Sequence, residues 1–313
     1  MDSELKKRVR ALVLMSGGLD SMLAAKILEE LGVEVTLICF ESYFFSSAGA
    51  KKAAENIGMN LRVHDLSLPH LAIVKRPHYG HGAGMNPCID CHLLMLKTAG
   101  EIMAREGFDF VATGEVLGER PMSQNRLSLD IIEKESGLTG RLLRPLSAKL
   151  LPKTVAEEKG LIDRDKLYDI SGRSRAVQYE LARRFNMTNI PQPGGGCLLT
   201  EPEYGRRLKE LMLAKPDFDG SDARLLKNCR PVWAGKLLVA VARDKNECVA
   251  LVGLARSGDL VLEPANFPGP AVLARDFGSG FKREEIMELA KSNLLRYSKK
   301  IPEDPEITIK DVI

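Results

Sequence analysis

A glycine-rich hexapeptide near the amino terminus constrains the fold of this chain more than any other feature. Residues 16–21 have the sequence Ser-Gly-Gly-Leu-Asp-Ser and follow an apolar, β-prone run from Arg10 to Met15. Apolar residues then recur at helical spacing from Ser21 to Leu31. This order predicts a strand, a tight turn and a helix. Backbone N–H groups and the positive end of the helix dipole bind phosphate at such a turn, although an ordinary packed turn is the alternative.

The pattern of a strand followed by a helix continues along the first part of the chain. Apolar and β-branched runs predict further strands at residues 33–40, 60–66 and 108–113, with a helix at residues 48–58 between the first two. Strands that alternate with helices are typical of a parallel sheet covered by helices on both faces. We therefore predict an α/β fold for this part of the chain.

A stretch rich in Pro, Gly and Asp at Lys215–Asp222 predicts a domain boundary. The chain has 313 residues, which is enough for two domains of roughly 150 residues each. We expect residues 1–215 to form the α/β domain. Residues 222–313 then form a smaller α+β domain with several short strands, one of them at Cys248–Leu254, and an amphipathic helix that begins at Arg283.

The composition excludes several other classes of protein. With 44% hydrophobic and 28% charged residues, the chain is expected to be globular rather than disordered. Its longest apolar runs fall far short of the roughly 20 residues that span a bilayer, and the run before Ser16 is too short for a signal peptide. We therefore expect a cytoplasmic protein with reduced thiols and no membrane contact. The net charge of +3 is too small to indicate a partner.

Three of the six cysteines follow a pattern that indicates chemistry. Cys88 and Cys91 are three residues apart at the predicted start of a helix, so both thiols can face one ion or cluster, and Cys197 follows three glycines in a loop. A helix start lowers the pKa of a thiol, so we expect at least one thiolate or metal ligand. Structural zinc held by these cysteines and a histidine is one alternative. The remaining cysteines are expected to be small core residues: Cys39, Cys229 and Cys248.

The hexapeptide at residues 16–21 resembles the pyrophosphate loop, or PP-loop, of the N-type ATP pyrophosphatases. Those enzymes cleave ATP between the α and β phosphates and transfer AMP to an oxygen atom that then leaves. The resemblance implies that the loop binds the β,γ-pyrophosphate with Mg²⁺, and that Asp20 assists the metal and the phosphates. It also implies that Phe40 contacts the adenine and that Gly114 lines the nucleotide pocket. The implied ATP-binding residues are Ser16, Gly17, Gly18, Asp20, Ser21, Phe40 and Gly114.

Other residues make the resemblance more specific. The pattern Asn-Pro-x-x-x-Cys that ends at Cys91, the later Cys197, and the motifs Ala-Thr-Gly at residues 112–114 and Arg-Pro-Leu at residues 144–146 resemble the tRNA 2-thiouridylases. The resemblance implies that Cys91 and Cys197 are catalytic. Two positions depart from the pattern, because Cys88 stands where many members have Asp and Glu115 stands where many have His.

The additional cysteine suggests a particular chemistry. Cys88, Cys91 and Cys197 resemble the three ligands with which some tRNA thiolases hold a [4Fe-4S] cluster. Three protein ligands leave one iron open to bind sulfide and present it to an adenylated base. The alternative is a persulfide relay without a metal, in which Cys91 carries the sulfur and Cys197 resolves it as a disulfide.

These resemblances imply an ATP-dependent sulfurtransferase that adenylates a carbonyl oxygen of a tRNA uridine and replaces it with sulfur. Sulfide or a persulfide carrier protein would supply the sulfur, and a homodimer is one oligomeric state to test. Two other functions stay open: a PP-loop enzyme acting on a small molecule, as an amidating ligase or a cofactor sulfur insertase, and a non-catalytic zinc- or nucleotide-binding accessory protein. Paired basic residues are candidate tRNA contacts: Arg173 and Arg175, Arg183 and Arg184, Arg206 and Arg207, and Lys299 and Lys300.

Overall fold

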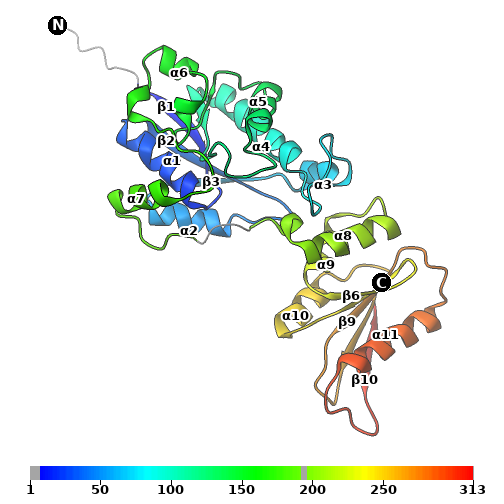
Figure 1. The fold of residues 1–313 in the computed structure, drawn as a ribbon. Helices are drawn as coiled ribbons and strands as arrows, with labels where there is room; N and C mark the ends of the chain where they lie inside the picture. The colour runs from blue at the N-terminus through cyan, green and yellow to red at the C-terminus, as the bar shows by residue number, and fades with distance from the viewer. Residues whose placement is uncertain (1–7, 192–195, 313) are drawn as a thin grey trace. The chain divides into compact units, whose positions relative to one another are not determined.

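The computed structural model describes residues 8–191 and 196–312, and it divides into two compact units between Leu198 and Leu199 (Figure 1). The predicted boundary at Lys215–Asp222 is therefore misplaced. That stretch is the turn between helices α8 (Pro202–Ala214) and α9 (Gly220–Lys227), which pack together within the second unit. The hydroxyl of Tyr204 in α8 donates a hydrogen bond of 3.0 Å to the carbonyl oxygen of Ala223 in α9.

The first unit is built around a parallel sheet with the strand order β3-β2-β1-β4-β5. This arrangement confirms the predicted α/β fold. The strands are β1 (Arg10–Leu14), β2 (Glu34–Glu41), β3 (Leu61–Asp65), β4 (Phe110–Ala112) and β5 (Leu142–Leu143). The helices are α1 (Leu19–Glu30), α2 (Ala48–Asn56), α3 (Ser67–Lys75), α4 (Cys88–Glu106), α5 (Arg126–Glu135), α6 (Val155–Glu158) and α7 (Ala176–Arg184).

Successive side chains of β1 enter hydrophobic cores on opposite faces of the sheet. Ala11 and Val13 pack with residues of α1, α2 and α7, whereas Leu12 packs with residues of α4 and α5. This alternation follows from the pleat of a strand, and burial on both faces is typical of parallel sheets. Since β1 pairs with β2 on one side and with β4 on the other, its carboxyl end lies at the switch point of the sheet. Ligands of open α/β sheets bind at such a point.

The second unit contains an antiparallel sheet with the strand order β10-β8-β9-β7-β6, packed against α11. It confirms the α+β prediction. Its strands are β6 (Arg230–Ala234), β7 (Leu237–Val241), β8 (Leu260–Pro264), β9 (Val272–Asp276) and β10 (Ile307–Asp311). Besides α8 and α9, its helices are α10 (Lys245–Gly253) and α11 (Arg283–Tyr297).

One predicted strand of this unit is wrong. The apolar run at Cys248–Leu254 lies in helix α10, not in a strand. Asp244 caps this helix, because its side chain accepts a hydrogen bond of 2.9 Å from the backbone N–H of Glu247. A capping carboxylate of this kind stabilises the first turn of a helix, and it outweighs the β propensity of the valines that follow.

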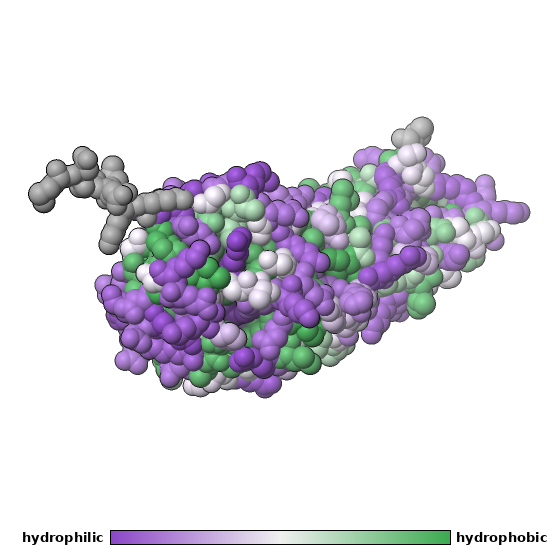
Figure 2. Space-filling view, turned by 90° about the horizontal axis from the view of Figure 1, so that it is seen from above, coloured by the Kyte–Doolittle hydropathy of each residue, from purple (hydrophilic) through white to green (hydrophobic). Residues whose placement is uncertain are grey.

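The described surface mixes hydrophilic and hydrophobic residues. In the face shown in Figure 2, hydrophilic residues predominate and the hydrophobic ones form separate patches. None of the helices in residues 8–191 and 196–312 has the length and apolar character needed to cross a membrane.

Candidate functional site

The predicted phosphate loop connects β1 to α1 at the switch point of the sheet. The Ser16 hydroxyl oxygen accepts a hydrogen bond of 3.3 Å from the backbone N–H of Gly18. The Ser21 hydroxyl donates a bond of 2.8 Å back to the carbonyl oxygen of Gly18. Among the described residues, no side chain caps helix α1 at Gly18. The N–H groups of the first helical turn therefore stay available to a phosphate group.

Two glycines are required by close backbone contacts around this loop. Gly17 has a φ of +88°, and a Cβ atom there would lie 2.6 Å from the carbonyl carbon of Gly49. Gly114, which follows β4, lies directly against the loop, because its Cβ would be only 2.4 Å from the carbonyl carbon of Asp20 and the nitrogen of Ser21. The structure thus brings Gly114 against the loop. Its contact with a nucleotide stays a prediction.

Asp20 is buried in the first turn of α1 and belongs to a network of charges. Its Oδ2 atom accepts a hydrogen bond of 3.1 Å from Nη2 of Arg175. The same nitrogen atom donates a bond of 2.7 Å to Oε1 of Glu119. Burial raises the pKa of Asp20, the charge of Glu119 raises it further, and Arg175 partly counteracts both. The sequence grouped Arg175 with surface cations, but the structure ties its side chain to this site.

Phe40 lies on β2 with its ring almost fully buried. It belongs to the core formed with Leu12, Leu66 and Leu93, and its ring meets the ring of His64 edge to face at 5.9 Å. Only 5% of Phe40 is exposed. Packing accounts for this aromatic residue, and its contact with adenine stays a prediction.

The predicted helix start at the cysteine pair is confirmed. Cys88 is the first residue of α4, and its sulfur atom accepts a hydrogen bond of 3.1 Å from the side-chain amide of Asn86. Burial raises the pKa of the Cys91 thiol well above its ordinary value, and negative charge on Cys197 and then on Cys88 raises it further. Cys88 and Cys197 therefore both lie close enough to Cys91 to affect its ionisation. The expected lowering of the pKa at the helix start is wrong for Cys91, since burial outweighs the helix dipole.

Within residues 8–191 and 196–312, no three His, Cys, Asp or Glu side chains are arranged to hold one metal ion. The predicted glycine loop before Cys197 lies partly outside the described residues, which begin again at Gly196.

Three charged or polar side chains form a chain of interactions that begins at the residue after Cys91. The sequence did not predict this chain. Nδ1 of His92, the neighbour of Cys91, lies 2.8 Å from Oε1 of Glu115. The other carboxylate oxygen of Glu115 accepts a bond of 2.9 Å from Nε of Arg144. Burial alone would raise the pKa of Glu115, but Arg144 and His92 outweigh it and lower the pKa to about 2. Arg144 and Glu115 stood out in the sequence, but their pairing did not.

Comparisons with known proteins agree with this geometry. The family model "Thiamine biosynthesis protein (ThiI)" matches residues 7–150. The tRNA-specific 2-thiouridylase MnmA of Herpetosiphon aurantiacus is 30% identical over 190 residues, which cover 50% of this chain and 53% of that protein. The MnmA of Sulfurimonas denitrificans is 35% identical over 122 residues, 34% of this chain and 35% of the relative. The first unit is a PP-loop domain.

Solved structures that match include one titled as a 4-thiouridine synthetase–RNA complex with bound ATP. It is 19% identical, with a TM-score of 0.40, and the match covers 69% of this chain and 53% of that one. The chain spans about half the length of the first curated relative, 53%, and a smaller share of the second, 35%. The family model lies entirely within the first unit, at residues 7–150, and the curated relatives named here are tRNA 2-thiouridylases.

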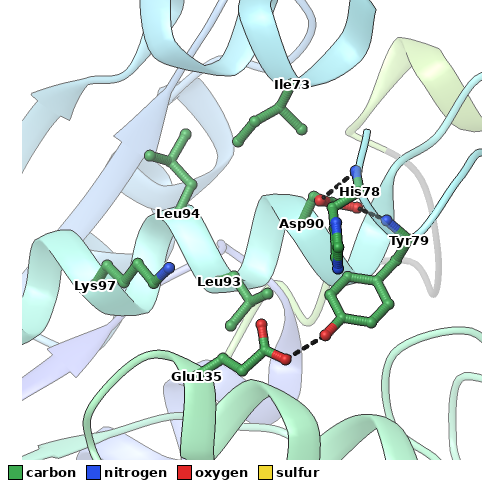
Figure 3. A pocket seen from close by; sticks show the side chains of 8 residues that line it. All are labelled: Ile73, His78, Tyr79, Asp90, Leu93, Leu94, Lys97 and Glu135. Atoms are coloured by element: carbon green, nitrogen blue, oxygen red, sulfur yellow. Dashed lines mark hydrogen bonds between the residues drawn. The ribbon is translucent and has the colours of Figure 1, made fainter. Parts of the chain in front are cut away.

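A cavity of about 420 Å³ lies in the PP-loop domain and is lined partly by residues of α4 (Figure 3). Asp90 orders its rim by accepting backbone hydrogen bonds of 2.9 Å from His78 and 3.0 Å from Tyr79. Residues of α4 are spaced by about 100° around the helix axis, which places Asp90 and Lys97 on a different face from the two cysteines. The lining residues are Ile73, His78, Tyr79, Asp90, Leu93, Leu94, Lys97 and Glu135.

The second unit has a basic pocket of about 510 Å³. The guanidinium of Arg230 lies 4.4 Å from the centre of the Tyr297 ring, a cation–π contact that fixes one wall. Four cations line the pocket and form no ion pair with any residue that the structure describes: Arg230, Lys245, Lys299 and Lys300. The predicted pair at residues 299 and 300 therefore belongs to a concave surface. Asp244 is the one carboxylate among the lining residues, so cations outnumber it and the pocket suits a phosphate group.

Proposed function

We propose that this protein is an ATP-dependent sulfurtransferase that adenylates a carbonyl oxygen of a tRNA uridine and replaces that oxygen with sulfur. One observation carries the proposal. The PP-loop domain combines the loop at residues 16–21, whose helix start has no side-chain cap, with a cysteine, Cys91, whose pKa is raised by both Cys88 and Cys197. An enzyme that only used ATP would have no need for the three cysteines.

The PP-loop serves the activation step. The free N–H groups at the start of α1 and the hydroxyls of Ser16 and Ser21 hold the β,γ-pyrophosphate, with Asp20 beside it. The uridine oxygen attacks the α phosphorus, the bond to the β phosphate breaks, and pyrophosphate leaves. A sulfur nucleophile then attacks the activated carbon, and the oxygen leaves with AMP as a stabilised phosphate, whereas oxide itself is a poor leaving group. Binding both reactants supplies proximity, and exclusion of water protects the adenylate.

The thiols of Cys88, Cys91 and Cys197 would hold a [4Fe-4S] cluster, which supplies an open iron position for sulfide. Each thiolate ligand of such a cluster binds a different iron. Cys88 and Cys197 both lie near enough to Cys91 to raise its pKa, which supports a single site that uses all three thiols. A persulfide relay through Cys91 and Cys197 is the second candidate, but it gives Cys88 no role.

The tRNA is the proposed partner, with sulfide or a persulfide carrier protein as the sulfur donor. The basic pocket of the second unit supports this partner, because unpaired cations in a concave surface neutralise backbone phosphates. The target base must leave its stack to reach a pocket. An enzyme acting on a small molecule would not need such a pocket, and neither would an accessory protein that binds only zinc.

Anaerobic purification followed by iron, sulfide and zinc assays tests the cysteine site. We expect about four irons and four sulfides per chain, lost in Cys88→Ala and kept in the matched control Cys248→Ser. Zinc in place of iron contradicts the cluster. Protein that binds no metal without any exposure to oxygen favours the persulfide relay.

Pyrophosphate release with and without tRNA tests the substrate. The proposal predicts release that depends on uridine-containing tRNA. Release that is independent of any RNA would contradict it and favour a small-molecule substrate.

A further inference from the structure

The charge network around Asp20 contains more than an ordinary ion pair. Nη2 of Arg175 lies within hydrogen-bond distance of two carboxylates from different elements, 3.1 Å from Asp20 Oδ2 and 2.7 Å from Glu119 Oε1. A single nitrogen atom therefore marks a point at which both carboxylates converge. Arg175 immediately precedes α7 and lies 155 residues from Asp20 in the sequence. The fold therefore brings these side chains together.

Two carboxylates that meet at one point beside a phosphate loop have the composition of a magnesium site. Mg²⁺ binds in proteins through one or two carboxylates together with substrate phosphates. A guanidinium nitrogen between two carboxylate oxygens takes the electrostatic place that a divalent cation would take. The arrangement therefore fits the Mg²⁺ that the PP-loop requires for ATP.

Buried polar atoms beside this point lack ordinary partners. Oδ1 of Asp20 makes no hydrogen bond of normal geometry with any described residue, although only 9% of Asp20 is exposed. The side-chain oxygen and nitrogen of Gln178, which has no exposed surface, likewise make no hydrogen bond of normal geometry with any described residue. Gln178 lies close enough to Asp20 to lower its pKa. Buried polar groups without partners are costly, and an ion or ordered water commonly explains them.

We propose that Arg175 and Mg²⁺ exchange places between Asp20 and Glu119 when ATP binds. Glu119 is then a second carboxylate ligand of the metal, and Arg175 moves onto the phosphate chain. The exchange conserves charge balance at both positions, since the dication neutralises the carboxylates that the guanidinium leaves and the guanidinium neutralises phosphate. This inference rests on the proposed use of ATP and adds two residues to it.

Cation binding and nucleotide binding should respond in opposite directions to the loss of Arg175. In Arg175→Gln the two carboxylates lose their internal cation, so we expect Mn²⁺ to bind at least about tenfold more tightly in the absence of nucleotide. The same variant lacks the phosphate contact, so Mg²⁺ with α,β-methylene-ATP should bind at least about tenfold more weakly. These factors correspond to a charge-assisted hydrogen bond. A residue with a purely structural role would weaken both.

The measurements are free Mn²⁺ by electron paramagnetic resonance and analogue binding by calorimetry, neither of which needs turnover. Arg173→Gln is the matched control, because Arg173 is exposed and forms no ion pair with the described residues; it should leave both affinities unchanged. Glu119→Gln should weaken Mn²⁺ binding and reduce the dependence of analogue affinity on Mg²⁺.

Unchanged Mn²⁺ affinity in Arg175→Gln, or a decrease in both affinities, would overturn the exchange. If the affinity of Glu119→Gln for the analogue depends on Mg²⁺ as strongly as that of the unmodified protein, Glu119 is not a ligand of the metal. If the unmodified protein binds no ATP analogue at all, the proposed function fails. If it binds the analogue and the variants behave like the unmodified protein, only this inference fails.

Discussion

The contact between Gly114 and the PP-loop can be tested by adding one methyl group. In Gly114→Ala the new Cβ would lie 2.4 Å from the carbonyl carbon of Asp20 and the nitrogen of Ser21. These are backbone atoms of the first turn of α1, so no flexible side chain can move aside. Either the end of β4 or the loop itself must shift.

The size of the effect follows from this geometry. Overpacking of a rigid site costs about 1–3 kcal/mol, which is the expected loss in the free energy of unfolding. Because the peptide that must move carries the phosphate-binding N–H groups, we also expect the affinity for Mg²⁺-ATP to fall about tenfold or more. Gly49→Ala is the control, since Gly49 lies in a helix and a Cβ there meets nothing within 4 Å. It should keep ATP affinity and raise stability by about 0.5–1 kcal/mol.

Urea denaturation and calorimetric titration with ATP measure the two quantities. If Gly114→Ala unfolds at the same urea concentration and binds ATP as tightly as the unmodified protein, the close approach of β4 and the PP-loop is refuted. A loss of stability with full ATP affinity would show that Gly114 supports the fold without shaping the site.

Further predictions concern the buried chain at Glu115 and the basic pocket. Because the folded pKa of Glu115, about 2, lies below the ordinary 4.5, its ionisation stabilises the fold above pH 4.5 by about 3 kcal/mol, and this contribution is lost as the pH falls toward 2. In urea titrations, Glu115→Gln should therefore have a lower free energy of unfolding at pH 7, and that free energy should fall less between pH 5 and pH 3 than in the unmodified protein. An equal pH dependence in both proteins would contradict the lowered pKa of Glu115. The double variant Lys299→Gln/Lys300→Gln removes two phosphate contacts. The slope of log affinity for tRNA against log salt concentration should therefore become shallower by about two. Lys236→Gln/Lys310→Gln removes the same charge outside the pocket, and an equal effect would refute a specific role of the pocket.

Local features of the sequence were sufficient to predict the fold of the first unit and the position of its loop. The glycines and the serines of residues 16–21 act within one turn, so their neighbours in sequence reveal their environment. The apolar run at Cys248–Leu254 was harder, because a short apolar segment suits a strand or a helix equally well. Asp244 and Glu247 carried the capping signal that decides between them.

Interactions between distant segments could not be predicted in the same way. Arg175 reaches Asp20 from 155 residues away in sequence, and Arg144 reaches Glu115 from 29 residues away. No spacing rule identifies such partners before the sheet brings them together. The pKa of Cys91 is a similar case, since the helix start is visible in the sequence but the burial that outweighs it is not.

Sulfur transfer to tRNA is the central claim, and mass spectrometry of the nucleosides from digested tRNA tests it most directly. Protein purified without oxygen is incubated with unmodified tRNA, ATP, Mg²⁺ and sulfide. The account predicts thiouridine that forms only with ATP and disappears in Cys91→Ala, while the control Cys229→Ala, at a buried cysteine of the second unit, retains it. If tRNA gains no sulfur from a protein that binds ATP and carries its cluster, the account is contradicted, and the substrate of this PP-loop domain is another molecule.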